Sequence, residues 1–104
     1  MHDGCYLIHF SKRLHHAGHY IGFTTNFQQR MQAHRNNIGA KLLRALNLIG
    51  ISWKVVRVWP GASNEFEFDL KALKKAPRLC PVCNPGSKSK LLEGSEVINV
   101  EVLN

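Results

Sequence analysis

The stretch from residue 4 to residue 23, GCYLIHFSKRLHHAGHYIGF, decides how the rest of the chain is arranged. Its two ends, residues 5–10 and 19–23, are apolar and aromatic, which is typical of β-strands. The polar residues 11–18 between them predict the loop of a hairpin. We therefore expect two paired strands, with a Gly-x-Tyr triplet on the first and a Tyr-x-Gly triplet on the second.

Helix and strand signals alternate after the hairpin. Helices are expected from the N-cap residue Asn26 to about residue 35, over residues 38–49, and over residues 64–75 behind a Ser63 cap. The remaining segments predict a third strand (51–59), a long loop (76–90) and either a short strand or a loose terminus (96–103).

These elements predict an α/β fold of the α+β type: a small three-stranded, mostly antiparallel sheet flanked by three helices. A length of 104 residues allows one domain over residues 1–104, with a core at about 4–75 and a Cys-containing loop and tail at 76–104. The predicted core includes Trp53, whereas Trp59 beside Pro60 is expected at a surface edge. The helical stripe expected to face the core is Ile38, Leu42, Ala45, Leu46 and Ile49.

Positive charge is concentrated in the first two thirds of the chain. The sequence holds fourteen Lys and Arg residues against seven Asp and Glu, a formal net charge of +7. No Asp or Glu occurs between residues 4 and 64, which carry eight Lys or Arg residues. A solvated basic face is the simpler interpretation, but so complete an exclusion of acidic residues favours nucleic acid as a partner.

The cysteine content and the N-terminus bear on the compartment. Three cysteines is an odd number, which fits a reducing environment better than a disulfide framework. The first residues have no signal-peptide pattern, and no apolar run approaches the ~20 residues of a membrane span. We expect a cytoplasmic protein with no membrane partner.

Chemistry-bearing residues follow the two triplets at regular positions. The triplets are Gly-Cys-Tyr at residues 4–6 and Tyr-Ile-Gly at residues 20–22. Arg30 lies eight residues after the second triplet on the predicted first helix, and His34 lies one helical turn further.

The third predicted helix carries Glu67, followed by Leu70 and Lys71. On these residues and the two triplets the chain resembles the GIY-YIG nuclease family, over roughly residues 4–75, as a small stand-alone catalytic domain. The resemblance implies the same fold and a divalent-metal-dependent endonuclease that cleaves DNA to a 5′-phosphate and a 3′-hydroxyl.

The resemblance also implies roles for five residues. Tyr6 is the candidate general base, and Tyr20 positions the attacking water or the phosphate. Arg30 can fork onto a phosphate oxygen, and His34 contacts the phosphate or accepts a proton. Glu67 is the candidate ligand of Mg²⁺ or Mn²⁺, which prefer oxygen ligands. Each residue alone also has a purely structural interpretation, and the joint placement favours the catalytic one.

DNA contacts are expected from six basic residues: Lys12, Arg13, Arg35, Lys41, Arg44 and Lys71. Phe23 stands where some family members carry a lysine beside the phosphate site. Lys12, Arg13 and His19 are the candidates for supplying the missing cation.

The sequence Cys80-Pro-Val-Cys83 leaves two interpretations open, a zinc site or a reduced thiol pair with opportunistic redox or metal chemistry. A structural zinc ion needs four ligands, and no second Cys or His pair of suitable spacing follows. We favour the thiol pair. The remote candidates for completing a zinc site are His2, Cys5, His15 and His16.

The favoured function is a structure-selective or weakly specific DNA endonuclease. The alternative is a catalytically weak or inactive nucleic-acid-binding module of the same fold. A third interpretation is a docking domain that uses the Cys-x-x-Cys loop. Partners are expected to be DNA and a targeting protein, and the chain to be a monomer or a weak dimer.

Overall fold

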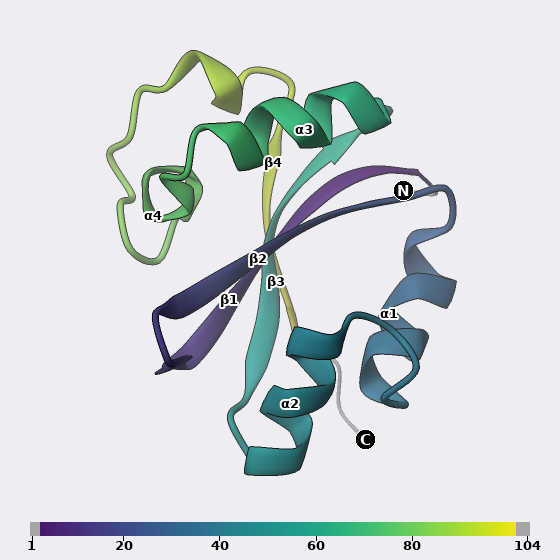
Figure 1. Cartoon of the computed structure of the whole chain (residues 1–104). Coiled ribbons are helices and arrows are strands. Elements are labelled where there is room, and N and C mark those ends of the chain that lie inside the picture. Colours follow the sequence, from purple (N-terminus) through teal and green to yellow (C-terminus); the bar gives the residue numbers. More distant parts are fainter. Residues whose placement is uncertain (1–2, 102–104) are drawn as a thin grey trace.

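The computed structural model describes residues 3–101. Four strands form one antiparallel sheet in the order β2-β1-β3-β4 (Figure 1). None of the helices in this part of the chain is both long enough and apolar enough to cross a membrane. The elements in chain order are β1 (Gly4–Leu14), β2 (Ala17–Thr24), α1 (Phe27–Arg35), α2 (Lys41–Ile49), β3 (Trp53–Pro60), α3 (Asn64–Ala72), α4 (Ala76–Leu79), a 3₁₀ turn (Lys90–Leu92) and β4 (Glu96–Glu101).

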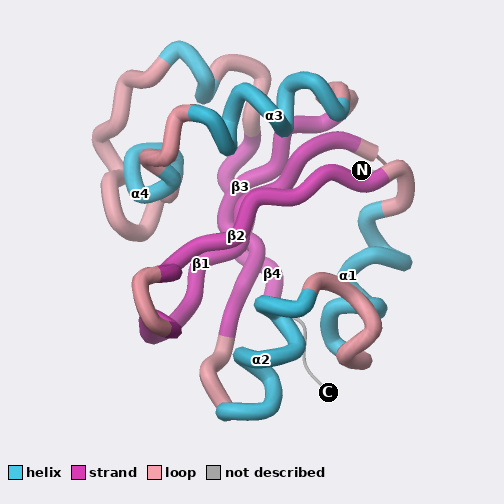
Figure 2. The backbone as a smooth tube through the Cα atoms, in the orientation of Figure 1, coloured by secondary structure: helices cyan, strands magenta, loops and turns pink. Residues whose placement is uncertain are grey.

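The sheet is the middle layer of three. Figures 1 and 2 show α3 and α4 on one side of it and α1 and α2 on the other. Alternation along β1 divides its side chains between two cores. The α1–α2 core contains Tyr6, Ile8, Phe10, Met31, Leu43 and Leu46. The α3–α4 core contains Cys5, Leu7, Leu70 and Leu79.

The predicted α+β fold with an antiparallel sheet is confirmed, and so are both predicted helix caps. The Asn26 side chain accepts a hydrogen bond from the backbone N–H of Gln29, and the Ser63 hydroxyl accepts one from Phe66. The expected strand count was one too low, because residues 96–101 pair with β3 as β4. The predicted loop at 76–90 also contains the short helix α4.

Two core predictions were wrong. Helix α2 begins at Lys41 rather than at residue 38, so Ile38 is 77 % exposed and the buried stripe is Leu43 and Leu46. The chain before α2 turns back onto α1, where the N–H of Ala40 bonds to a side chain. Trp59 is only 2 % exposed, because the C-terminal segment covers it and the Leu91 carbonyl accepts its indole N–H at 2.7 Å.

Candidate active site

The two triplets of the hairpin meet directly across the β1–β2 pair. Tyr6 and Gly22 are register partners, and the buried ring of Tyr6 lies across the α-carbon of Gly22. A Cβ atom at position 22 would overlap Cζ and Oη of Tyr6. Gly4 has a φ of +133°, and a Cβ there would overlap the carbonyl oxygen of Trp59. Both glycines are therefore required by local sterics.

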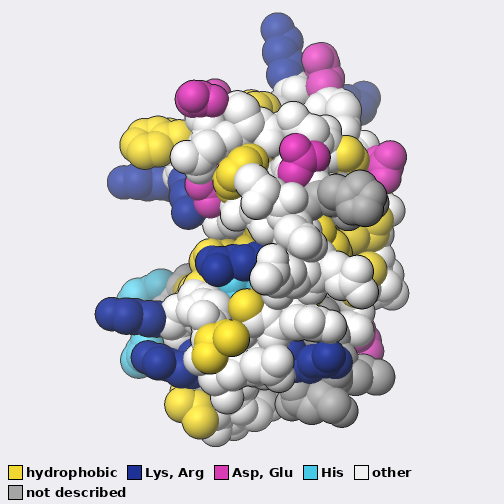
Figure 3. Space-filling model, turned by 90° about the vertical axis from the view of Figure 1, so that its right-hand side faces the viewer, with side chains coloured by type: hydrophobic (Ala, Val, Ile, Leu, Met, Phe, Trp, Pro, Cys, Tyr) yellow, Lys and Arg dark blue, Asp and Glu magenta, His cyan; other side chains and the backbone are white. Residues whose placement is uncertain are grey.

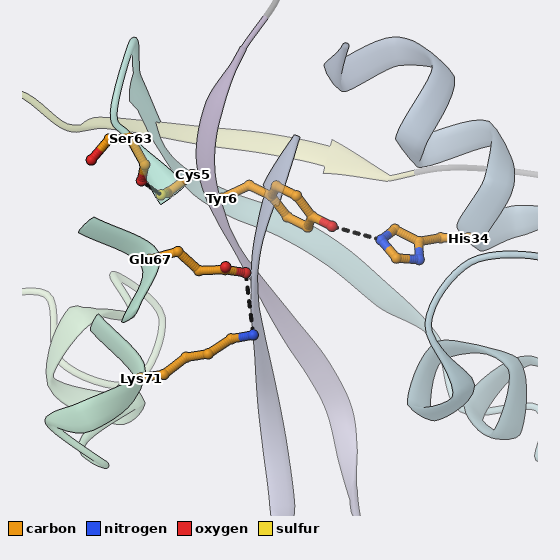
Figure 4. Close-up of polar contacts among 6 residues, drawn as sticks. All are labelled: Cys5, Tyr6, His34, Ser63, Glu67 and Lys71. Carbon is orange, nitrogen blue, oxygen red and sulfur yellow. Dashed lines mark hydrogen bonds and ion pairs between the residues drawn. The ribbon is translucent and has the colours of Figure 1, made fainter. Parts of the chain in front are cut away.

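His34 holds the Tyr6 hydroxyl in place. The Tyr6 Oη atom lies 2.8 Å from His34 Nε2, and both residues are fully buried (Figure 4). The other ring nitrogen, Nδ1, accepts a hydrogen bond from the Ala40 N–H at 3.3 Å. Because Nδ1 is an acceptor, the proton of a neutral His34 is on Nε2, and Nε2–H donates to the Tyr6 oxygen.

The positions behind His34 were missed by sequence reasoning. A Cβ at Gly39 would overlap His34 Nδ1, so only glycine lets the backbone pass this close. The Asn47 amide donates to the His34 carbonyl at 2.9 Å and accepts the Trp53 indole N–H at 2.9 Å. An Asn on the polar side of a helix gives no sequence signal of such a role.

Arg30 and Tyr20 complete this group. Arg30 Nε is buried and has no hydrogen-bond partner among residues 3–101. The half-buried Tyr20 ring lies 6.1 Å from the Tyr6 ring and 5.6 Å from the His34 ring, measured between centroids. Helix α1 presents Arg30 and His34 one turn apart, so the predicted spacing brings both to the two tyrosines.

Burial sets the protonation states here. It raises the pKa of Tyr6 above its ordinary value, against the opposing effect of the neighbouring Arg30 guanidinium. It lowers the pKa of His34 to about 4, and the charge of Arg30 adds to that shift. At neutral pH both Tyr6 and His34 are therefore uncharged, and Arg30 carries the positive charge of the group.

Glu67 and Lys71 approach from the opposite layer, on α3. They form an ion pair of 3.2 Å, in which the Glu67 side chain is 18 % exposed and that of Lys71 52 %. Lys71 Nζ lies 5.9 Å from the centre of the Tyr20 ring. Figure 4 shows this pair on one side of β2 and the Tyr6–His34 pair on the other. Tyr20, on the edge strand β2, therefore links the two halves of the site.

The Glu67 carboxylate has the chemistry that Mg²⁺ requires. Hard divalent ions take carboxylate, phosphate and water oxygens, and one carboxylate with the rest supplied by substrate and water is an ordinary Mg²⁺ arrangement. Lys71 now holds this carboxylate, so cation binding has to compete with the ion pair.

The six predicted DNA-contacting residues do not lie together. Arg13 and Lys71 line a groove with a volume of about 540 Å³ between the hairpin and α3–α4, together with Lys74. Lys12 is exposed on the hairpin beside Arg13, whereas Arg35, Lys41 and Arg44 belong to the α1–α2 layer. Figure 3 shows an indentation of the surface between the two layers, with basic side chains above and below it.

A second cluster lies on the α3–α4 side of the sheet. It consists of His9 on β1, its register partner His19 on β2, and Cys80 and Cys83 after α4. Burial lowers the pKa of both imidazoles, that of His19 to about 4. The pKa of the Cys83 thiol is raised, first by burial and then by Cys80. We call these four residues the Cys/His cluster.

The remote zinc candidates considered from sequence do not lie beside Cys80 and Cys83 where the structure describes them. His15 and His16 form the hairpin turn outside the cluster, and Cys5 is buried against the Ser63 carbonyl, with its pKa raised to about 11. His2 lies outside the described residues. His9 and His19, which do lie beside the cysteines, were missed because only the strand pairing brings them together. His19 is thus placed with the cysteines rather than as the cation that Phe23 lacks.

Comparison with known proteins gives one match. The model of the GIY-YIG catalytic domain matches residues 2–78. The searches of curated proteins and of solved structures found no match.

Proposed function

Because this chain belongs to the GIY-YIG nuclease family, we propose that it is a divalent-metal-dependent endonuclease that hydrolyses phosphodiester bonds of DNA. The observation that carries the proposal is the buried, unpartnered Nε of Arg30 beside Tyr6 and Tyr20. Leaving a buried guanidinium nitrogen unpaired is costly, and a phosphate oxygen is the partner that suits it. The proposed substrate preference is structural or weakly sequence-specific, since phosphate contacts from lysines and arginines position a protein on DNA without reading its sequence.

Arg30 and Lys71 are proposed to stabilise the phosphate. Arg30 forks onto a non-bridging oxygen and offsets the charge that develops there. Lys71 lies near Tyr20 at the edge of the site, with its side chain 52 % exposed. It is therefore suited to supply the cation that Phe23 does not provide.

Tyr6 is proposed as the proton acceptor for the attacking water, and Tyr20 as the group that orients water or phosphate. A buried phenol with a raised pKa needs help to lose its proton. His34 Nε2–H donates to the same oxygen and stabilises the phenolate form, and Arg30 adds positive charge. His34 thus acts through Tyr6 as a positioning residue, which refines the expectation that it touches phosphate or takes a proton.

Glu67 is proposed to hold Mg²⁺ or Mn²⁺. When bound, the ion supplies positive charge at the scissile phosphate and lowers the pKa of water. Glu67 must leave Lys71 for this, and a single carboxylate holds such an ion weakly, so binding is coupled to the substrate. Lys71 is then free to move to the phosphate.

The test is a plasmid-nicking assay at low salt with Mg²⁺ or Mn²⁺, including branched substrates. Glu67→Gln and Arg30→Ala should each lower cleavage by about 100-fold or more. Glu65→Gln, on the exposed side of the same helix, is the matched control and should cut like the unmodified chain. Equal cleavage by all variants would show a contaminant or a misplaced site.

A catalytically weak nucleic-acid-binding module is the second candidate. The observation that favours it is that Lys71 already neutralises the proposed metal ligand. In that case the unmodified chain and both variants would bind DNA without cutting it, and the affinity would depend on salt but not on Mg²⁺.

A further inference from the structure

The Cys/His cluster brings four metal-binding side chains to one point. The ligand atoms of His9, His19, Cys80 and Cys83 all lie within 4.8 Å of one another. They come from two neighbouring strands and from a segment more than 60 residues later in the chain. The cluster is separate from the Tyr6–His34 pair, which faces the other helix layer, and it shares the groove beside α3 with Lys71.

Four of the six distances within the cluster are close to the edges of a tetrahedron around a metal, and all six are within 4.8 Å. Zinc binds sulfur at about 2.3 Å and imidazole nitrogen at about 2.0–2.1 Å. From these lengths, tetrahedral edges are about 3.3–3.4 Å between two nitrogens and about 3.5–3.6 Å between nitrogen and sulfur. His9 Nδ1 and His19 Nε2 are 3.4 Å apart. The nitrogen–sulfur distances are 3.4 Å from His9 to Cys80, 3.8 Å from His9 to Cys83 and 3.5 Å from His19 to Cys83.

Hydrogen bonding alone does not account for this arrangement. His9 Nδ1 faces three acceptor or donor atoms at once, although a ring nitrogen carries at most one proton. A Cys–His hydrogen bond would need one such contact rather than a convergence of four ligand atoms on a common centre. A cation between the four atoms satisfies all of them together.

The backbone around the cysteines holds them in position. Arg57 Nε donates to the Leu79 carbonyl at 2.8 Å, and Arg57 Nη1 donates to Ser95 Oγ. The N–H of Asn84 closes the Cys-x-x-Cys turn on the Cys80 carbonyl at 2.9 Å. These contacts fix the start and the end of the turn, so the two sulfurs are presented together to the histidine pair.

We propose that His9, His19, Cys80 and Cys83 bind one Zn²⁺ ion in a closed, structural site. Two thiolates and two imidazoles in a tetrahedron select zinc among the common divalent ions. On binding, each thiol releases its proton to solvent and forms a sulfur–zinc bond, with no oxidation or reduction. The site joins the segment after α4 to the far half of the β1–β2 hairpin. It also supplies the second ligand pair whose absence from the sequence argued against zinc.

The first test is the metal content of the untagged, reduced chain by plasma mass spectrometry. We expect about one zinc per chain, and a thermal transition that falls when a strong chelator removes the metal. The metal-free chain titrated with Co²⁺ should show the visible bands of tetrahedral cobalt and a thiolate charge-transfer band. Sub-stoichiometric zinc together with an octahedral Co²⁺ spectrum would overturn the proposal.

Matched variants test the ligand set. Cys83→Ser and His19→Gln should lose the stoichiometric zinc and the tetrahedral spectrum; Cys83 is exposed, so its replacement leaves the core intact. His15→Asn and Cys5→Ala are the controls and should keep both, and so should Glu67→Gln, which separates this site from the nuclease site. Zinc retained at wild-type affinity in Cys83→Ser, or a Cys80–Cys83 disulfide that persists in reducing buffer, would contradict the assignment.

Discussion

His34 and His9 lie on opposite sides of the same sheet and are used in different ways. Each nitrogen of His34 has one partner, the Ala40 N–H on one side and the Tyr6 hydroxyl on the other, and the N–H fixes which nitrogen is the acceptor. The single nitrogen of His9 that enters the Cys/His cluster faces three ligand atoms at 3.4–3.8 Å. One partner per nitrogen determines the tautomer of His34 and orients Tyr6. Three ligand atoms around one nitrogen of His9 are the pattern of a metal ligand. The number of partners per nitrogen therefore separates a positioning histidine from a metal-binding one.

The largest effect is expected from filling the space beside the positioned tyrosine. In Gly22→Ala the new methyl group must displace the Tyr6 ring, and a shift of about 1 Å at a reacting group costs on the order of 100-fold in rate. Gly86→Ala is the control, because a Cβ there meets nothing within 4 Å. The nicking assay compares the two. Equal activities of the two variants would exclude Tyr6 from the active site. Both variants should keep their zinc.

Acid should weaken the fold through His34. Its pKa is lowered to about 4 in the folded chain, so below its ordinary pKa of about 6.5 the unfolded chain binds more protons. Its stabilising contribution is complete above pH 6.5 and is lost as the pH falls towards 4, by about 2–3 kcal/mol. Urea unfolding of His34→Gln should show a correspondingly smaller pH dependence.

This comparison is made in a Cys83→Ser background, in which metal release does not contribute. His19 and His9 titrate in both proteins, so the difference between the curves reports His34. Identical pH dependences would mean that His34 is not the neutral, buried group described above.

Loosening the Cys80–Cys83 turn should weaken zinc binding at the Cys/His cluster and leave the Tyr6–His34 pair intact. Arg57→Lys removes the paired hydrogen bonds to Leu79 and Ser95, at a cost of about 1–2 kcal/mol. Zinc affinity should fall about tenfold, as is usual when a supporting contact is lost. Arg78→Lys, at an exposed position, is the control for both measurements. An unchanged zinc affinity would show that the turn holds its shape without Arg57.

The smallest effect is expected at the groove. Lys71→Ala should lower the slope of log affinity against log salt for DNA by about 1, which corresponds to one phosphate contact. Lys88→Ala, in the exposed segment after the cysteines, should leave the slope unchanged. Measuring DNA binding without divalent ions in a Glu67→Gln background frees Lys71 from its ion pair and keeps this effect apart from cleavage. If Lys71→Ala left the slope unchanged, the groove would be excluded as the DNA-binding surface.

Local signals explain what the sequence predicted well. The apolar and aromatic run at residues 5–10, the Asn26 and Ser63 caps and the spacing from Arg30 to His34 each involve neighbours in sequence, and each has its expected structure. The placement of the two triplets on neighbouring strands followed from the predicted hairpin. These features do not depend on how distant segments pack.

Long-range packing explains what was missed. Trp59 is buried by the Leu91 segment, which contacts it from 32 residues away, and β4 is a strand because β3 offers it an edge. The cysteines meet His9 across 71 and 74 residues, a separation at which spacing rules for zinc ligands have no force. The close approach of Gly39 to His34 leaves no sign in the hydrophobic pattern of the sequence, so Ile38 was predicted to lie in a helix.

The pairing of Tyr6 with Gly22 constrains how such chains diverge. Residues added at the His15–His16 turn lengthen the hairpin by moving its tip outward, and leave the pairs behind it unchanged. A slip of one residue between the strands would set Ile21 or Phe23 against Tyr6, where a side chain has no room. Changes in the length of the hairpin at its turn should therefore be tolerated, whereas insertions and deletions within the paired strands should be eliminated by selection.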